Sequence, residues 1–219
     1  LGRGSVLLVQ AVLVTSVLFA LPMSAYQQHR RLTRSDWLWA VLLAASVIVI
    51  VTIGNPTAGH SRASLETWAV VTGVLGTVLV LCVAAANAVR GPLSAVLLAV
   101  VSGALWGVFA VLTKGVVHLL GHGIEPLVRS PELYAWAAVA VAGTAWQQSS
   151  FRAGALTASL PTMTITEPLV ASVLGVVVLG ETLRPGEAGW AVLVAAIVAL
   201  VASVVGLART EATAPAAAI

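Results

Sequence analysis

Residues 158–180 read ASLPTMTITEPLVASVLGVVVLG, an apolar run of membrane-spanning length with one charged side chain, Glu167. A bilayer core about 30 Å thick needs roughly 20 apolar residues in a helix. The same kind of run occurs at 4–26, 37–54, 67–89, 93–120, 133–151 and 188–208. None alternates apolar and polar residues as a barrel strand does, and lipid cannot satisfy exposed backbone groups, so each run is expected to be a helix. The sequence therefore predicts an all-α polytopic membrane protein with seven transmembrane helices.

The composition agrees with a chain that faces lipid. Hydrophobic residues make up 59% of the 219 residues and charged residues only 9%, against roughly 25% charged residues in a soluble domain. The 11 Lys and Arg residues are scattered along the chain, most of them near run ends, rather than gathered into a patch, which predicts membrane topology and no nucleic-acid partner. A single cysteine, Cys82, excludes a disulfide framework and a cysteine-based metal site, and no cofactor or metal is expected.

The distribution of positive charge predicts the orientation. One set of loops and ends carries Arg30, Arg31, Arg34, Arg90, Arg152 and Arg209 against two acids, Asp36 and Glu211. The opposite set carries four Arg and five Glu. Since cytoplasmic loops carry the excess of Lys and Arg, the first set is expected inside, which places the C-terminus in the cytoplasm and the protein in the cytoplasmic membrane.

An internal repeat appears when the sequence is shifted by 151 positions. WAVLLAASV at 39–47 then aligns with WAVLVAAIV at 190–198, with seven identities in nine, and further matches follow without a gap. The last two predicted helices therefore look like a copy of the first two. On this interpretation 1–58 holds the last two helices of a first repeat, 59–210 is a complete five-helix repeat, and 211–219 is a flexible tail. Five helices per repeat is an odd number, so the two repeats would be inverted relative to each other, as in many transporters.

Three segments resemble a known family. They are Ser102–Lys114 (SGALWGVFAVLTK), Trp146–Gly154 (WQQSSFRAG) and 158–181, which contains Thr166-Glu167-Pro168 and ends on Gly180-Glu181. On these segments the chain resembles the drug/metabolite transporter superfamily in its EamA-type branch. The resemblance implies two inverted five-helix repeats, alternating access, and three further helices before Leu1.

Glu167 is the first candidate site residue. An acid near the bilayer midplane is costly, so it should face protein or water and have a partner. Pro168 frees a backbone carbonyl one turn earlier, and the hydroxyl of Thr166 can satisfy loosened backbone. These three residues are predicted to bind substrate or a coupling proton; the alternative is a structural, protonated glutamic acid.

Lys114 is the second charge inside a predicted span. Three interpretations stay open: a solvated helix end reached by its long stem, a vestibule for an anionic solute, or a metal site with His118 and His122 at a spacing of four residues. No carboxylate or cysteine nearby completes a metal set, so no metal ligand is predicted.

Gln147, Gln148 and Trp106 complete the candidate set for substrate or coupling-ion binding. Glutamines inside a span hydrogen-bond across helices or to a ligand. Gly103 and Gly107, which flank Trp106 in a Gly-x-x-x-Gly pattern, permit close helix approach. Packing and cavity lining are both compatible with this pattern.

The predicted function is secondary active transport of a small metabolite or drug-like solute, with protons as a possible second partner through Glu167. Enzymatic activity is not expected, because no nucleophile set or phosphate-binding loop is present. The alternatives are a flippase for a lipid-linked headgroup, a magnesium transporter, and a membrane subunit that only packs on a partner. A homodimer is a further possibility.

Overall fold

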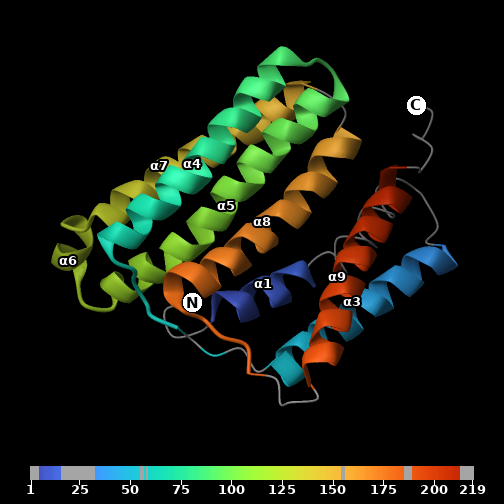
Figure 1. The fold of residues 1–219 in the computed structure, drawn as a ribbon, viewed down its shortest axis with the longest axis horizontal. Helices are drawn as coiled ribbons and strands as arrows, with labels where there is room; N and C mark the ends of the chain where they lie inside the picture. The colour runs from blue at the N-terminus through green and yellow to red at the C-terminus, as the bar shows by residue number, and fades with distance from the viewer. Residues whose placement is uncertain are drawn as a thin grey trace. The chain divides into compact units, whose positions relative to one another are not determined.

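The computed structural model describes residues 5–15, 33–54, 57, 59–153, 156–184 and 189–212. All regular structure in these residues is helical, and an isolated antiparallel bridge joins Thr57 to Thr182. The all-α fold class is thereby confirmed for this part of the chain. The chain divides into two compact units, coloured by residue number in Figure 1, and each is described by itself.

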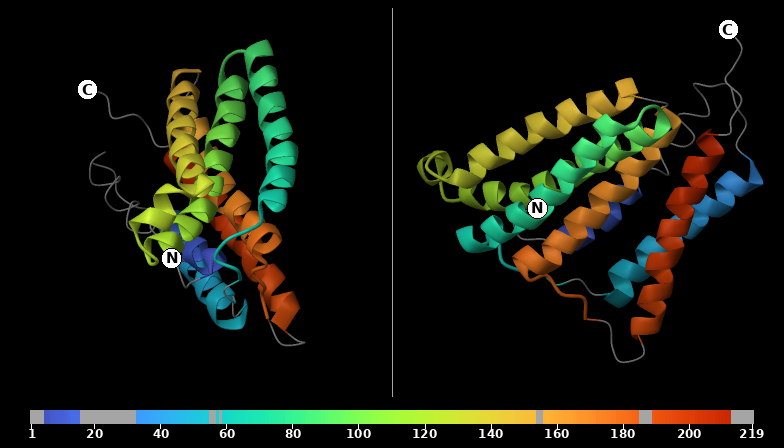
Figure 2. Two further views of the ribbon diagram at one scale, coloured as in Figure 1. Left: turned by 90° about the vertical axis from the view of Figure 1, so that its left-hand side faces the viewer. Right: turned by 45° about the horizontal axis from the view of Figure 1, so that its top comes forward.

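Unit 1 comprises Leu1–Val9 and Thr57–Thr182. Its helices are α4 (Leu65–Ala88), α5 (Pro92–Leu120), the short α6 (Ile124–Val128), α7 (Pro131–Ala153) and α8 (Leu156–Leu179), together with the first turn of α1 (Val6–Val14). Helix α5 is central: it packs along α7 and α8 and, less extensively, against α4 (Figure 2). The core therefore lies along α5, which is the most buried of the long helices.

Local sequence explains where these helices begin and end. Ser64 caps α4, since its hydroxyl accepts a hydrogen bond of 3.1 Å from the backbone N–H of Thr67. Gly91, with φ of 77°, turns the chain into α5, whose first residue is Pro92. Gly180, with φ of 63°, ends α8 in the left-handed conformation that glycine adopts without strain.

Unit 2 comprises Gln10–Pro56 and Leu183–Ile219. Its two long helices, α3 (Arg34–Gly54) and α9 (Gly189–Ala212), pack against each other. Thr33 and Asp36 start α3 as a reciprocal capping pair, with hydrogen bonds of 2.8 and 3.2 Å. Trp39 packs on Gly206, where any side chain would overlap the indole ring.

Five helices in the described residues are long and apolar enough to cross a membrane: Arg34–Gly54, Leu65–Ala88, Pro92–Leu120, Thr162–Leu179 and Gly189–Gly206. Five of the seven predicted spans correspond to them. The stretch 133–151 forms helix α7, but α7 is not among these five. Of the stretch 4–26, the structure describes 5–15 as a short helix and a turn, and the rest lies outside the described residues. The count of seven spans therefore stays a prediction.

The compact units group the helices differently from the proposed repeats. Helix α9, which the sequence pattern assigns to 59–210 as the end of the second repeat, packs with α3 from the first. A repeat is a relation between sequences and need not be a compact unit, so the inverted repeat and the boundaries 1–58, 59–210 and 211–219 remain predictions. The tail from residue 213 onward lies outside the described residues.

Candidate functional site

Helices α5 and α8 touch through the two glycines of the Gly-x-x-x-Gly pattern. A Cβ at Gly107 would lie 2.9 Å from the backbone oxygen of Glu167 and 2.9 Å from the backbone nitrogen of Ala171. A Cβ at Gly103 would lie 2.9 Å from the Cβ of Thr166. Such distances are too short for a real side chain, so the close approach of the two helices depends on glycine at both positions. The close helix approach predicted from this pattern is confirmed, and it is centred on Thr166, Glu167 and Ala171.

Glu167 lies close to the middle of α8 and is half-buried. Its carboxyl group makes no hydrogen bond or ion pair with another described residue. Pro168 has no N–H to give the carbonyl of Thr164. The hydroxyl of Thr166 donates to the carbonyl of Thr162 at 2.8 Å, as expected for a threonine that satisfies helix backbone. The partner expected for Glu167 is thus absent from the described part of the chain.

The structure separates the two glutamines that were predicted as site residues on α7. The indole N–H of Trp106 donates to the side-chain oxygen of Gln147 at 3.3 Å, which links α5 to α7. Two serines tie the same helices together: Ser102 donates to the carbonyl of Gly143, and Ser150 donates to that of Ala95. Gln148 is exposed and makes none of these contacts. The structure therefore brings Trp106 and Gln147 together and leaves Gln148 apart from them.

Lys114 is fully buried, so the expectation of a solvated helix end is wrong. Only 1% of the residue is exposed, and its Nζ lies 2.8 Å from Oε1 of Glu181. Lys114 therefore does not extend to solvent, because a closer anion lies just beyond the end of α8. This contact also places Lys114 with Glu181 rather than with Glu167.

Glu181 gathers a complete set of donors. Besides Lys114, its carboxylate accepts from the backbone N–H of Val6 at 2.7 Å, that of Leu7 at 3.0 Å and the hydroxyl of Ser5 at 2.8 Å. These donors form the first turn of α1, where free N–H groups and the helix dipole favour an anion. Burial by itself raises the pKa of Glu181, but the bonds from Lys114, Leu7, Val6 and Ser5 outweigh it and hold the pKa below its ordinary value of 4.5. The residue is an anion that anchors α1 to the ends of α5 and α8.

The sequence pattern did not single out Glu181 as a partner of Lys114. Glu181 follows the helix-ending Gly180 and reads as one of several loop acids. Its distance of 67 positions from Lys114 carries no periodic signal. Only the folded backbone brings the two charges together.

His118 and His122 lie next to each other, with ring centroids 4.6 Å apart. The ring Nδ1 of His122 lies 2.9 Å from the carbonyl oxygen of His118, so that nitrogen donates to the backbone. Within the described residues no cluster of three His, Cys, Asp or Glu side chains could hold a metal ion.

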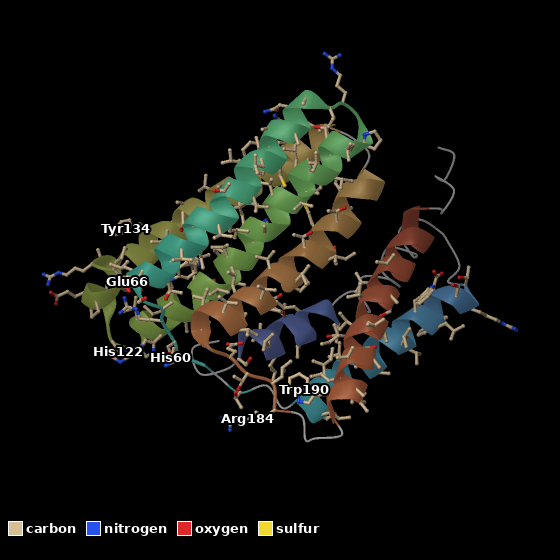
Figure 3. All side chains as sticks on the ribbon, viewed as in Figure 1. His60, Glu66, His122, Tyr134, Arg184 and Trp190 are labelled. Carbon is tan, nitrogen blue, oxygen red and sulfur yellow. The ribbon has the colours of Figure 1, made fainter. Side chains whose placement is uncertain are left out.

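A groove of about 260 Å³ opens between α4, α5 and α7. Its walls are almost wholly apolar and include Trp68, Leu75, Gly76 and Val139. Glu132, at the start of α7, lies at one end of the groove and is paired with Arg62 at 2.6 Å. Figure 3 shows Glu66, His122 and Tyr134 at this same end of unit 1, where α4 begins and α5 ends.

The described fold is that of a helical protein with several helices suited to a membrane. Over 216 residues the chain is 39% identical to the uncharacterized protein Cgl0250/cg0304 of Corynebacterium glutamicum. The aligned region covers 96% of this chain and 73% of the relative. The chain belongs to the family of that protein. No family model and no solved structure matches this chain.

Proposed function

We propose that this protein is a secondary active transporter of the cytoplasmic membrane that moves a small metabolite or drug-like solute by alternating access. The observation that carries the proposal is Glu167, a half-buried acid in the middle of an apolar helix with no partner among the described residues. An ionisable residue inside a membrane span is rare and is usually retained for function.

The surroundings of Glu167 support a moving site rather than a rigid one. Pro168 removes one backbone hydrogen bond from α8 at this level, and at Gly103 and Gly107 no side chain of α5 stands between the two helices. A helix that lacks a backbone hydrogen bond at a proline can bend there at low energetic cost. Glu167 would take up a proton when the site faces one side of the membrane and release it toward the other.

The EamA-type resemblance in the three segments adds to this proposal, because it implies alternating access between inverted repeats. Of the alternatives, the groove between α4, α5 and α7 favours a flippase for a lipid-linked headgroup. Magnesium transport has less support, since no cluster of metal-binding side chains occurs in the described residues.

The test is uptake into proteoliposomes that contain a pH-sensitive dye, with and without an imposed pH gradient. Amino acids, purine nucleosides and tetraphenylphosphonium form the solute panel. We expect at least one solute to enter in a gradient-dependent manner and to carry protons. Glu167→Gln should reduce the gradient-driven part by about 100-fold, as expected when a proton carrier is lost.

Glu66→Gln is the matched control, because Glu66 is an exposed acid at the start of α4 outside the candidate site. It should transport like the wild type. Gradient-driven uptake that survives in Glu167→Gln would show that this residue does not couple transport to protons. Movement of fluorescent lipid between leaflets, with no solute uptake, would favour the flippase.

A further inference from the structure

The two halves of α8, before and after Pro168, are packed differently. After Pro168, four residues of α8 belong to the buried core of unit 1, where they meet residues of α5 and the first turn of α1: Ala171, Leu174, Val178 and Leu179. Before Pro168, the buried residues that the structure describes are Ser159 and Met163, and neither belongs to this core. The apolar packing that fixes α8 therefore lies mainly on its C-terminal side.

Hydrogen bonds hold the C-terminal end of α8 as well. Glu181, two residues beyond the helix, pairs with Lys114 of α5 at 2.8 Å and accepts three hydrogen bonds from the first turn of α1. The backbone N–H of His60 donates to the carbonyl of Leu179 at 2.7 Å. Movement of this end would break several of these bonds at once, so 169–179 is firmly attached to α5.

The N-terminal half of α8 has no comparable attachment. Within the described residues, no side-chain hydrogen bond joins 163–179 to α5, and the two helices approach each other most closely at Gly103 and Gly107. The hydroxyl of Ser159 is buried and has no hydrogen-bond partner in the part of the chain that the structure describes. A buried hydroxyl without a partner is unfavourable, and a movement that brings it to water removes this cost.

Helix α7 shows a rigid attachment to α5 in the same unit. The hydroxyl of Ser150 donates to the carbonyl of Ala95 at 2.8 Å, and the indole N–H of Trp136 donates to the hydroxyl of Thr113 at 2.9 Å. The other bonds between these helices, described above, lie between these two. Hydrogen bonds thus follow the contact of α7 with α5 along its length, whereas α8 is bonded at one end.

Pro168 lies at the boundary between the two halves of α8. It has no N–H to give the carbonyl of Thr164, so a bend in the turn 164–168 costs little free energy. A bend of about 20° would move Leu160, which lies about 12 Å along the helix from Pro168, by about 4 Å. Glu167 belongs to the same turn, so its surroundings would change with the bend.

We propose that 156–164 is a movable arm, that α8 bends in the turn 164–168, and that 169–179 stays fixed on α5. The arm moves Met163 away from Gly103 while α5 and α7 move as one body. This proposal rests on the packing within unit 1 and not on the transport proposal, so either one can fail without the other.

Distances between pairs of spin labels test the arm. A label at Val141 of α7 is paired with a second label at Leu160 on the arm, at Val177 on the fixed half, or at Val117 on α5, and all four side chains are exposed. The labels are attached to cysteines in a Cys82→Ser background of the full chain, and double electron–electron resonance in lipid nanodiscs gives the distances. We expect the distances to Leu160 to spread about 4 Å more widely than those to Val177 and Val117.

Pro168→Ala supplies the missing N–H, so it should narrow the distances between Val141 and Leu160 to the spread of the two control pairs. Pro161→Ala is the matched control, because it replaces a proline of the same helix about two turns earlier and should leave the spread unchanged. A wild-type spread to Leu160 no wider than the spread to Val177 overturns the proposal, as does a Pro168→Ala variant with the wild-type spread. If Pro161→Ala alone narrowed the distances, the bend would lie outside the turn 164–168, and the proposal would be wrong.

Discussion

At the scale of single residues, the two acids Glu167 and Glu181 have opposite surroundings. Glu181 is saturated with donors and paired with Lys114, whereas Glu167 has no partner among the described residues. A saturated ion pair fixes one structure, while an unpartnered acid is free to exchange a proton. The Lys114–Glu181 pair is therefore expected to determine stability, and Glu167 is proposed to determine function.

Removal of one member of the Lys114–Glu181 pair should destabilise unit 1 strongly. Glu181→Gln leaves a buried lysine without its anion, for which a loss of about 3–5 kcal/mol is expected. Lys114→Met combined with Glu181→Gln should recover part of this loss, since no uncompensated charge remains. Thermal unfolding in detergent, followed by tryptophan fluorescence, measures both effects.

The control for this prediction is the exposed pair Arg129–Glu125, at 79% and 72% side-chain exposure. Glu125→Gln should change stability by less than about 0.5 kcal/mol, because water screens a surface pair. Equal effects of Glu125→Gln and Glu181→Gln would contradict the structural role assigned to the buried pair.

The same carboxylate predicts a pH dependence. The pKa of Glu181 is lower in the folded protein than its ordinary value of 4.5, so its contribution to stability is present above pH 4.5. That contribution is lost as the pH falls through the folded-state pKa. The Tm of the wild type should therefore fall more steeply below pH 4.5 than the Tm of Glu181→Gln. Parallel curves of Tm against pH for the two proteins would show that the hydrogen bonds to Glu181 do not stabilise the folded protein.

At the scale of elements, the contact between α5 and α8 depends on having no side chain at Gly107. Gly107→Val places methyl groups against the backbone of Glu167 and Ala171, so α8 must move. Overpacking of this kind lowers stability by about 1–3 kcal/mol. Thermal unfolding should show this decrease, and any transport found for the wild type should be lost as well.

Gly73→Val on α4 is the comparison for this element. It makes the same change in a helix where a Cβ would meet nothing within 4 Å. Its Tm should stay within a few degrees of the wild type. If Gly73→Val and Gly107→Val lowered the Tm equally, valine would be acting through helix propensity rather than through the α5–α8 contact.

At the scale of the whole molecule, the charge bias predicts which ends of unit 1 face the cytoplasm. Helix α5 separates Arg90 from His122, and both residues are exposed. In a Cys82→Ser background, His122→Cys should react with a membrane-impermeant maleimide added to intact cells. Arg90→Cys should react only after the cells are opened. The reverse pattern would overturn the predicted orientation and with it the cytoplasmic C-terminus.

The sequence alone was sufficient for the helical class and for five helices of spanning length, because apolar runs and helix-ending residues act locally. Gly103 and Gly107 also predicted a close helix contact, since that pattern places two glycines on one face. Helix α7 shows the limit of this reasoning: its predicted run forms a helix, but polar residues such as Gln147 and Ser150 face α5, and α7 is not among the five apolar helices.

Only the tertiary structure decided which partner each polar side chain has. Lys114 could have extended to solvent, bound an anion or joined the histidines, and its spacing in the sequence allowed all three. The fold placed Glu181 and the first turn of α1 beside it. It likewise placed Arg62 on one oxygen of Glu132 and left the other oxygen buried, without a hydrogen-bond partner among the described residues. Helix formation depends on neighbours in the chain, whereas the pairing of buried charges depends on residues that become neighbours only when the helices pack.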